Sequence, residues 1–193
     1  MKPVVLIAYP DAWGCYDKFA RKLNHILSQM TDFSVLYPHD ERGFIDQCFT
    51  NDERVTLCDV VNESCLNITH GIIFDDGVSF ESLKNQLGSK NVLLRHINIE
   101  ISRVVNIDKQ KDFDVYIGRG SGFGNPYAIG IEGDDRDEVI RKFKYDFDRD
   151  FLKDNFKRRI LKYRGKQLGC HCKPMSCHGD VLVEFLNSYD DGL

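Results

Sequence analysis

Val4-Val5-Leu6-Ile7-Ala8 is followed directly by Tyr9-Pro10-Asp11, and this sequence predicts a buried strand that ends in a loop. Five apolar residues in a row leave the strand no polar face for water. Both of its faces must therefore be covered, which is typical of strands in a parallel sheet. In residues 16–30 the apolar side chains recur at helical spacing, which predicts a crossover helix after the strand.

The alternation of strand and helix continues through the first half of the chain. Further strands are predicted at residues 33–37, 70–74 and 91–97, and further helices at residues 43–61 and 79–87. Ser79 is the expected N-cap of the last of these helices. This order predicts a parallel sheet with crossover helices, and ligands bind such sheets beyond the carboxyl ends of the strands.

The second half of the chain has a different pattern. Short strands are predicted at residues 104–107, 114–117 and 166–170, and helices at residues 137–152 and 179–186. We therefore predict an α/β protein with two parts. Residues 1–101 form a Rossmann-like parallel sheet with crossover helices. It is packed on a smaller α+β part, residues 102–193, which carries a turn rich in cysteine and histidine.

Composition and charge exclude several classes of protein. The net charge of -4 argues against coating of nucleic acid by the whole surface. The start of the chain lacks the pattern of a signal peptide, and no apolar run approaches the roughly 20 residues of a membrane helix. We therefore expect no membrane association. Seven cysteines without a secretory signal indicate reduced thiols rather than a disulfide framework. The oligomeric state is left open.

Four metal-ligating side chains lie within nine residues near the end of the chain: Cys170, Cys172, Cys177 and His178. Zinc prefers four such ligands in a tetrahedron, so a zinc site is one interpretation. Catalysis by Cys177 and His178 is a second, because the start of a helix lowers a thiol pKa, and Asp180 is placed to orient His178. Burial of the cysteines as small apolar groups is a third.

A glycine-rich loop is the second candidate site. Its predicted ligand-binding residues are Gly118, Arg119, Gly120, Ser121, Gly124 and Asn125. The loop could present backbone N–H groups to a phosphate or carboxylate, with Arg119 as a bidentate partner. Asn125 could contact a base edge or a carbonyl. The alternative is a tight structural turn in which Arg119 pairs with a carboxylate.

Two further segments carry weaker signals. The acidic turn Asp75-Asp76-Gly77 follows a strand, and Asp76 and Gly77 are predicted to bind Mg²⁺ or a ribose hydroxyl, with a solvated turn as the alternative. The run Lys157-Arg158-Arg159 is a candidate contact to a nucleic-acid backbone. Basic residues that complement a helix C-terminus are the alternative interpretation of that run.

Two motifs of the second half carry a family resemblance. The motifs are Val115-Tyr116-Ile117-Gly118-Arg119-Gly120 with Gly124-Asn125-Pro126, and Cys170-His171-Cys172-Lys173-Pro174 with Cys177-His178-Gly179-Asp180. Residues 102–187 thereby resemble domain-of-unknown-function family 4326, which is common in bacteria and bacteriophages. His171 departs from that family, which often has Trp at this position. The resemblance implies an architecture and a site rather than a particular reaction.

The first half carries a second resemblance. Its basis is residues 4–8 with the following helix, and Gly71-Ile72-Ile73-Phe74-Asp75-Asp76-Gly77 before Ser79. Residues 3–98 resemble the Rossmann-like domains of the SLOG group, which includes DprA proteins, LOG phosphoribohydrolases and YspA-like proteins. The hydrolase signature G-G-x-G-T-x-x-E of that group is absent. The resemblance therefore implies binding of a nucleotide-like ligand.

The sequence as a whole predicts an enzyme that processes nucleotides or nucleosides. As a hydrolase or transferase it would act on a glycosidic or phosphate bond, with zinc as a candidate cofactor. One alternative is a non-catalytic protein that binds a nucleotide or nucleic acid, as in phage–host conflict. Another is a zinc-stapled interaction scaffold. The expected location is the cytoplasm of a bacterium, or of a host cell if a phage encodes the protein.

Overall fold

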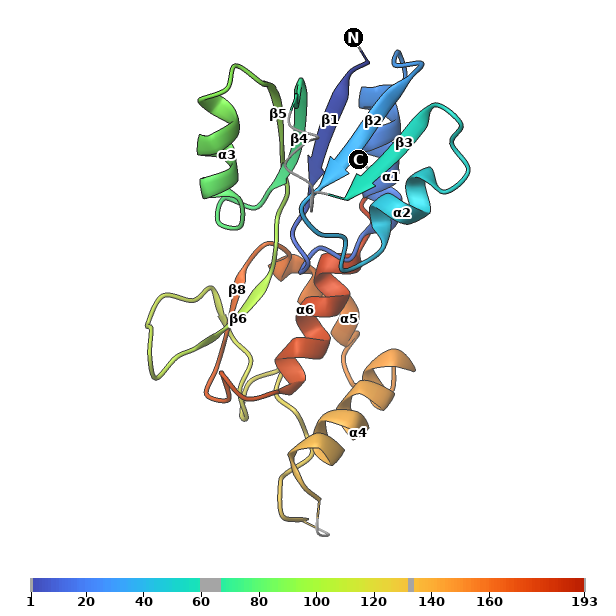
Figure 1. Cartoon of the computed structure of the whole chain (residues 1–193). Helices are drawn as coiled ribbons and strands as arrows, with labels where there is room; N and C mark the ends of the chain where they lie inside the picture. The colour runs from blue at the N-terminus through green and yellow to red at the C-terminus, as the bar shows by residue number, and fades with distance from the viewer. Residues whose placement is uncertain (1, 60–66, 132–133, 193) are drawn as a thin grey trace. The chain divides into compact units, whose positions relative to one another are not determined.

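The structure is a computed structural model, and it describes residues 2–59, 67–131 and 134–192 (Figure 1). The chain divides into two compact units. The first unit consists of residues 1–99 together with residues 190–193, and the second unit consists of residues 100–189. None of the helices among the described residues has both the length and the apolar character needed to cross a membrane.

A five-stranded parallel sheet forms the centre of the first unit. The strands are β1 (Val4–Ala8), β2 (Phe33–Tyr37), β3 (Val55–Asp59), β4 (His70–Asp75) and β5 (Leu93–Asn98). Their order is β3-β2-β1-β4-β5, and every neighbouring pair is parallel. The helices are α1 (Tyr16–Leu27), α2 (Phe44–Phe49) and α3 (Glu81–Gly88). The predicted Rossmann-like α/β arrangement is confirmed.

The apolar segment Val4–Ala8 forms β1, the middle strand of this sheet. Val5 pairs with Val35 on one side and with His70 on the other. Val5, Ile7 and Ala8 are fully buried, as is Phe19 on the inner face of α1. Their burial on both faces explains why β1 contains no polar residue.

The predicted helix at residues 43–61 is confirmed at its start, where α2 forms, and is wrong beyond it. The helix α2 ends at Phe49, and residues 55–59 form β3 instead. The hydroxyl of Thr50 donates to the carbonyl of Asp46 at 2.6 Å, and Asp52 pairs with Arg54, so residues 50–54 make a turn. The β3 backbone then pairs with β2, a long-range interaction that outweighs the local helical pattern. Residues 60–61 of that prediction lie outside the described part of the chain.

The predicted N-cap at Ser79 is also wrong. The helix α3 begins at Glu81, and its N-cap position is Phe80. The hydroxyl of Ser79 donates to the Asp76 carboxylate at 2.7 Å, so it closes the preceding turn rather than capping the helix.

The second unit is built on a small parallel sheet. Its strands are β6 (Arg103–Asn106), β7 (Val115–Tyr116) and β8 (Gln167–Cys170), in the order β6-β8-β7. The helices are α4 (Arg136–Asp148), α5 (Phe156–Ile160), the 3₁₀ helix η3 (Leu161–Tyr163) and α6 (His178–Ser188). Phe143, Phe147 and Phe156 form the centre of its apolar core with Leu168 of β8.

Two details of the second unit complete this description. Phe151, which lies within the predicted helix at residues 137–152, is 65% exposed because α4 ends at Asp148 before reaching it. Asn187 of α6 is buried, and its side chain accepts a hydrogen bond from Ser102 N at 2.8 Å and donates one to Ser102 O at 3.1 Å. The first and last segments of this unit are therefore joined by a pair of hydrogen bonds.

Candidate functional site

The sheet of the second unit brings the glycine loop and the cysteine turn together. β7 and β8 are parallel, with Tyr116 paired to Gly169, so their carboxyl ends lie side by side. Ile117 N donates to Gly169 O at 2.9 Å. The glycine loop therefore leaves the sheet beside Cys170, at the place where parallel sheets bind ligands.

Three cysteine sulfurs form a cluster at this edge. The Sγ atoms of Cys170, Cys172 and Cys177 all lie within 4.8 Å of one another, and those of Cys170 and Cys172 are 3.6 Å apart. Tetrahedral zinc with Zn–S bonds of about 2.3 Å separates its sulfur ligands by about 3.8 Å. The spacing of the cluster is therefore compatible with a bound metal ion.

His178 does not complete the predicted four-ligand set. Its side chain is buried, and its Nε2 lies 2.8 Å from the carbonyl oxygen of Ile117. A carbonyl can only accept a hydrogen bond, so Nε2 carries the proton and the lone pair is on Nδ1. The potential metal ligands of the described residues whose atoms lie within 4.8 Å of one another are the three cysteines, without His178. The ring also packs edge-on against Phe143, with 5.1 Å between centroids. Burial lowers the pKa of His178, which favours the neutral ring.

Asp180 does not orient His178 as predicted. One of its carboxylate oxygens accepts a hydrogen bond from Cys177 N at 2.9 Å, and the other accepts one from Lys173 Nζ. These contacts form a capping box at the start of α6. Asp180 therefore holds the cysteine turn against the helix and fixes the backbone of Cys177.

The electrostatics of the cluster favour Cys170 as the anionic sulfur. A hydrogen bond from the Cys177 thiol lowers the pKa of Cys170 well below its ordinary value, helped by contacts from Cys172. The same hydrogen bond, together with burial, raises the pKa of Cys177. A reactive thiolate in the absence of metal would thus be Cys170, rather than Cys177 as the sequence suggested.

A pocket of about 230 Å³ joins the cluster to the glycine loop. Gly118, Arg119 and Asn125 line it from the loop, together with the three cysteines and His178. Its other lining residues are Tyr116, Tyr127, Ile129, Arg136, Val139, Ile140 and His171. The structure thus brings residues from two separately predicted sites into one cavity.

The glycine residues of the loop allow close approach of its backbone. A Cβ atom on Gly124 would lie 2.7 Å from Gly118 O, which leaves no room for a side chain. Gly120 has a φ of 89°, a backbone conformation that favours glycine. The Ser121 hydroxyl accepts from Phe123 N at 3.1 Å. Gly120, Ser121 and Gly124 are not among the residues that line the pocket, so their observed role is to shape the loop.

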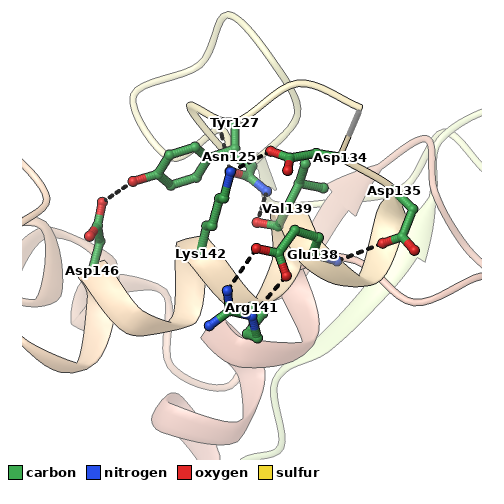
Figure 2. A network of polar contacts seen from close by, with 9 residues as sticks. All are labelled: Asn125, Tyr127, Asp134, Asp135, Glu138, Val139, Arg141, Lys142 and Asp146. Carbon is green, nitrogen blue, oxygen red and sulfur yellow. Dashed lines mark hydrogen bonds and ion pairs between the residues drawn. The ribbon is translucent and has the colours of Figure 1, made fainter. Parts of the chain in front are cut away.

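Arg119 and Asn125 differ in their availability to a ligand. The Asn125 amide donates to Val139 O at 3.0 Å and its oxygen accepts from Tyr127 N at 2.9 Å, which ties the loop to α4 (Figure 2). Its hydrogen-bonding groups are thus already engaged. Arg119 is exposed, and among residues 2–59, 67–131 and 134–192 it forms no hydrogen bond or ion pair. Its guanidinium is therefore available to an anion.

Sequence reasoning did not predict a binding role for four polar or aromatic residues of the lining. Arg136, the first residue of α4, donates to Ser176 O at 3.2 Å and lies beside Cys172. Tyr116, Tyr127 and His171 add aromatic surface to the pocket. His171 lies inside the cysteine motif and could have been identified there. Nothing in the local sequence of Arg136 relates it to a turn some 40 residues later.

The acidic turn of the first unit is held by hydrogen bonds between its own residues. One oxygen of Asp76 accepts from Val78 N at 3.0 Å and from Ser79 N at 2.8 Å. Gly77 has a φ of 80° and its N–H donates to Asp75 at 2.9 Å. These contacts account for the residue types of the turn without a ligand, so binding by Asp76 and Gly77 stays a prediction.

Two of the three predicted nucleic-acid contacts have partners within the chain. Lys157 pairs with Asp150 at 3.1 Å, and Arg159 donates to Gly122 O at 3.2 Å. Arg158 is exposed and has no such partner among the described residues. Nucleic-acid binding through this segment therefore stays a prediction.

The parallel α/β fold and the pocket define a class of protein with a Rossmann-like unit and a separate cysteine-lined site. Residues 2–105 match the family described as "Minimal SLOG domain", and residues 100–188 match the "Domain of unknown function (DUF4326)". The chain belongs to the minimal SLOG domain family, and its second unit resembles the DUF4326 family. Both predicted resemblances are confirmed, and SLOG membership suggests a nucleotide-related function.

A phage protein is also similar to this chain. It is the uncharacterized 12.4 kDa protein in the nrdA-td intergenic region of Enterobacteria phage T4, 41% identical over 88 residues. The similarity covers 45% of this chain and 79% of the phage protein. No solved structure matches the chain.

Proposed function

We propose that the protein is a nucleotide- or nucleoside-processing enzyme that acts on a glycosidic or phosphate bond at the pocket of its second unit. The observation that carries this proposal is the position of the sulfur cluster. Cys170, Cys172 and Cys177 line the same cavity as Arg119 and the glycine loop. The cysteine sulfurs, which can bind a metal or react, and Arg119, which can bind an anion, thus line one cavity.

The ligand count favours a reactive zinc ion over a structural one. Structural zinc sites are closed by four protein ligands, whereas catalytic zinc has three and keeps one position for water or substrate. The cluster offers three sulfurs, and His178 is not among the ligand atoms that lie within 4.8 Å of one another. Zinc bound by the three cysteines would keep one coordination position for a small ligand, and all three line the pocket.

The charges around the pocket suit this role. Three thiolates and one Zn²⁺ ion carry a net charge of −1, which by itself would repel an anionic ligand. Arg119 and Arg136 line the pocket and offset that charge. A zinc ion supplies a Lewis acid that polarises a phosphoryl or carbonyl oxygen, or activates a water molecule. The arginines would hold the ligand beside it.

Other functions use the same pocket. A non-catalytic protein would bind a nucleotide there without turnover, as in phage–host conflict. A zinc-stapled scaffold would need the metal only for folding. Nucleic acid is a further candidate partner, through Arg158. In each case the three neighbouring thiols suit a reducing compartment, and we place the protein in the cytoplasm of a bacterium or a phage-infected host.

The test combines metal analysis with turnover. Purified protein should contain about one zinc ion per chain, and a panel of nucleotides and nucleosides should reveal a product by chromatography. Cys172→Ser should lose both the metal and the turnover. Cys48→Ser, which changes a cysteine of α2 in the first unit, is the matched control and should lose neither.

The alternatives give different outcomes. Zinc without turnover, but with a thermal shift on adding a nucleotide, would indicate a binding protein. Zinc with no response to any nucleotide would indicate a scaffold. A stable, metal-free protein would refute the metal centre and direct attention to Cys170 as a thiolate.

A further inference from the structure

His171 is held rigidly although it is exposed. Its Nδ1 lies 3.0 Å from both carboxylate oxygens of Asp108, and its ring packs edge-on against Tyr116, with 5.9 Å between centroids. The side chain nevertheless remains 56% exposed. An imidazole ring fixed from two sides, with its remaining surface open, is a ready-made surface for stacking.

Asn106, at the end of β6, fixes both members of this pair. Its side-chain amide donates to His171 O at 3.2 Å, and its side-chain oxygen accepts from Asp108 N at 2.8 Å. The same amide also donates to Lys173 O, so Asn106 holds the backbone on both sides of Cys172. The backbone that carries His171 and the backbone of its partner Asp108 are therefore fixed by one side chain.

Apart from the cysteine sulfurs, the charged residues of the pocket are of one sign. Arg119 and Arg136 line it, and the described lining residues include no Asp or Glu. A guanidinium group matches phosphate through two parallel hydrogen bonds. The remaining walls are aromatic or aliphatic, with Tyr116, Tyr127 and His171 as the aromatic members.

We propose that the ligand of this pocket is a nucleoside phosphate held at two points. The planar base stacks on the face of the His171 ring, which Tyr116 supports edge-on, and the phosphate is bound by Arg119 and Arg136. This inference rests on the proposed function in taking the pocket as the reaction site, and it adds the substrate class. It assigns to His171 a role in specificity, because a ligand without a planar ring would lose that contact.

The experiment measures binding by calorimetry on the full chain. The probes are AMP, GMP, CMP and UMP, the nucleoside of the tightest binder, ribose 5-phosphate and inorganic phosphate. One nucleoside monophosphate should bind at least about tenfold more tightly than its nucleoside and than ribose 5-phosphate, because each fragment lacks one of the two contacts.

Two variants separate the two contacts. Arg119→Ala should lower the affinity for the nucleotide by at least about tenfold and leave the affinity for the nucleoside unchanged. His171→Ala should lower the affinity for both the nucleotide and the nucleoside. The affinity for ribose 5-phosphate should stay unchanged. His171→Trp, which keeps a planar ring, should restore most of the lost affinity. If His171→Ala does not fold, Asp108→Ala frees the ring and should produce the same pattern more weakly.

Matched controls remove the same side chains elsewhere. Arg158→Ala removes an exposed arginine of α5, and His25→Ala an exposed histidine of α1, and neither should change any affinity. The proposal is overturned if no monophosphate binds, if inorganic phosphate binds as tightly as the nucleotide, or if Arg119→Ala weakens nucleoside and nucleotide alike.

A failure of this inference can be distinguished from a failure of the proposed function. The predicted binding pattern in a protein without zinc or turnover would support the ligand class and refute the chemistry. Zinc-dependent turnover of a compound that lacks a base or a phosphate would do the reverse.

Discussion

Gly124→Ala tests the close packing of Gly124 against the backbone of Gly118 and Arg119 in the glycine loop. A Cβ atom at this position would lie 2.7 Å from Gly118 O and 3.1 Å from Arg119 Cα. Both contacts are with backbone atoms, so no side-chain rotation can relieve them. The loop must open or shift instead, and overpacking of this kind costs about 1–3 kcal/mol. For a chain of this length that corresponds to a fall in Tm of about 2–12 °C.

Two other glycines provide matched controls. A Cβ on Gly122, in the same loop, would meet the end of the Arg159 side chain, which can move, so Gly122→Ala should cost less. Gly88, the last residue of α3, has no atom within 4 Å of a new Cβ, and Gly88→Ala should stabilise the protein by up to about 1 kcal/mol.

Scanning calorimetry or thermal unfolding by circular dichroism measures all three variants. The expected order of Tm is Gly88→Ala above the parent protein, and Gly124→Ala below Gly122→Ala. Because Gly118 and Arg119 line the pocket, Gly124→Ala should also lower the affinity for the nucleotide that binds most tightly in the calorimetry experiment. A Gly124→Ala variant with the parent Tm and the parent affinity would show that the loop is not packed as described.

Two further predictions concern the cap of α6 and the basic segment. Asp180→Ala should destabilise the protein by about 1 kcal/mol, because Cys177 N loses its acceptor, and should release zinc to a chelator at a lower concentration. Asp137→Ala, which removes the same charge from the first turn of α4, is its control, and equal zinc retention in both variants would contradict the capping role. If Arg158 contacts nucleic acid, Arg158→Ala should lower the salt slope of binding by about one in a gel-shift titration. The absence of any shift at low salt with single- or double-stranded probes would remove nucleic acid as a partner.

The strands of the first unit could be predicted because their burial is recorded in their own composition. The five apolar residues of β1 have to be covered on both faces wherever the strand lies in the sheet. β3 could not be predicted in this way. Residues 55–59 have one polar residue in the second position and one at the end, and their pairing with β2 makes them a strand. Such pairing depends on residues some 20 positions away.

In the candidate site, too, local features could be predicted from the sequence, and features that depend on distant residues could not. The cysteine spacing indicated a cluster, and the structure contains one. The position of His178 depended on where α6 begins, and the sequence placed that start at Gly179, one residue too late. With His178 as the first helical residue and Cys177 as an extended N-cap, the two side chains diverge. The pocket itself depends on the register between β7 and β8, which no local pattern encodes.

The pair of hydrogen bonds between Ser102 and Asn187 has a consequence for how the second unit folds. It joins residues 85 positions apart, and β6 and β8 add further pairings between distant segments. A unit whose ends close on each other has a high contact order, and such units fold slowly because the chain must first lose the entropy of a long loop. During synthesis, its amino-terminal strand can pair only after β8 has left the ribosome, and the hydrogen bonds to Asn187 form only after the last helix has followed. The exposed thiols of an incomplete chain would be open to oxidation throughout that interval.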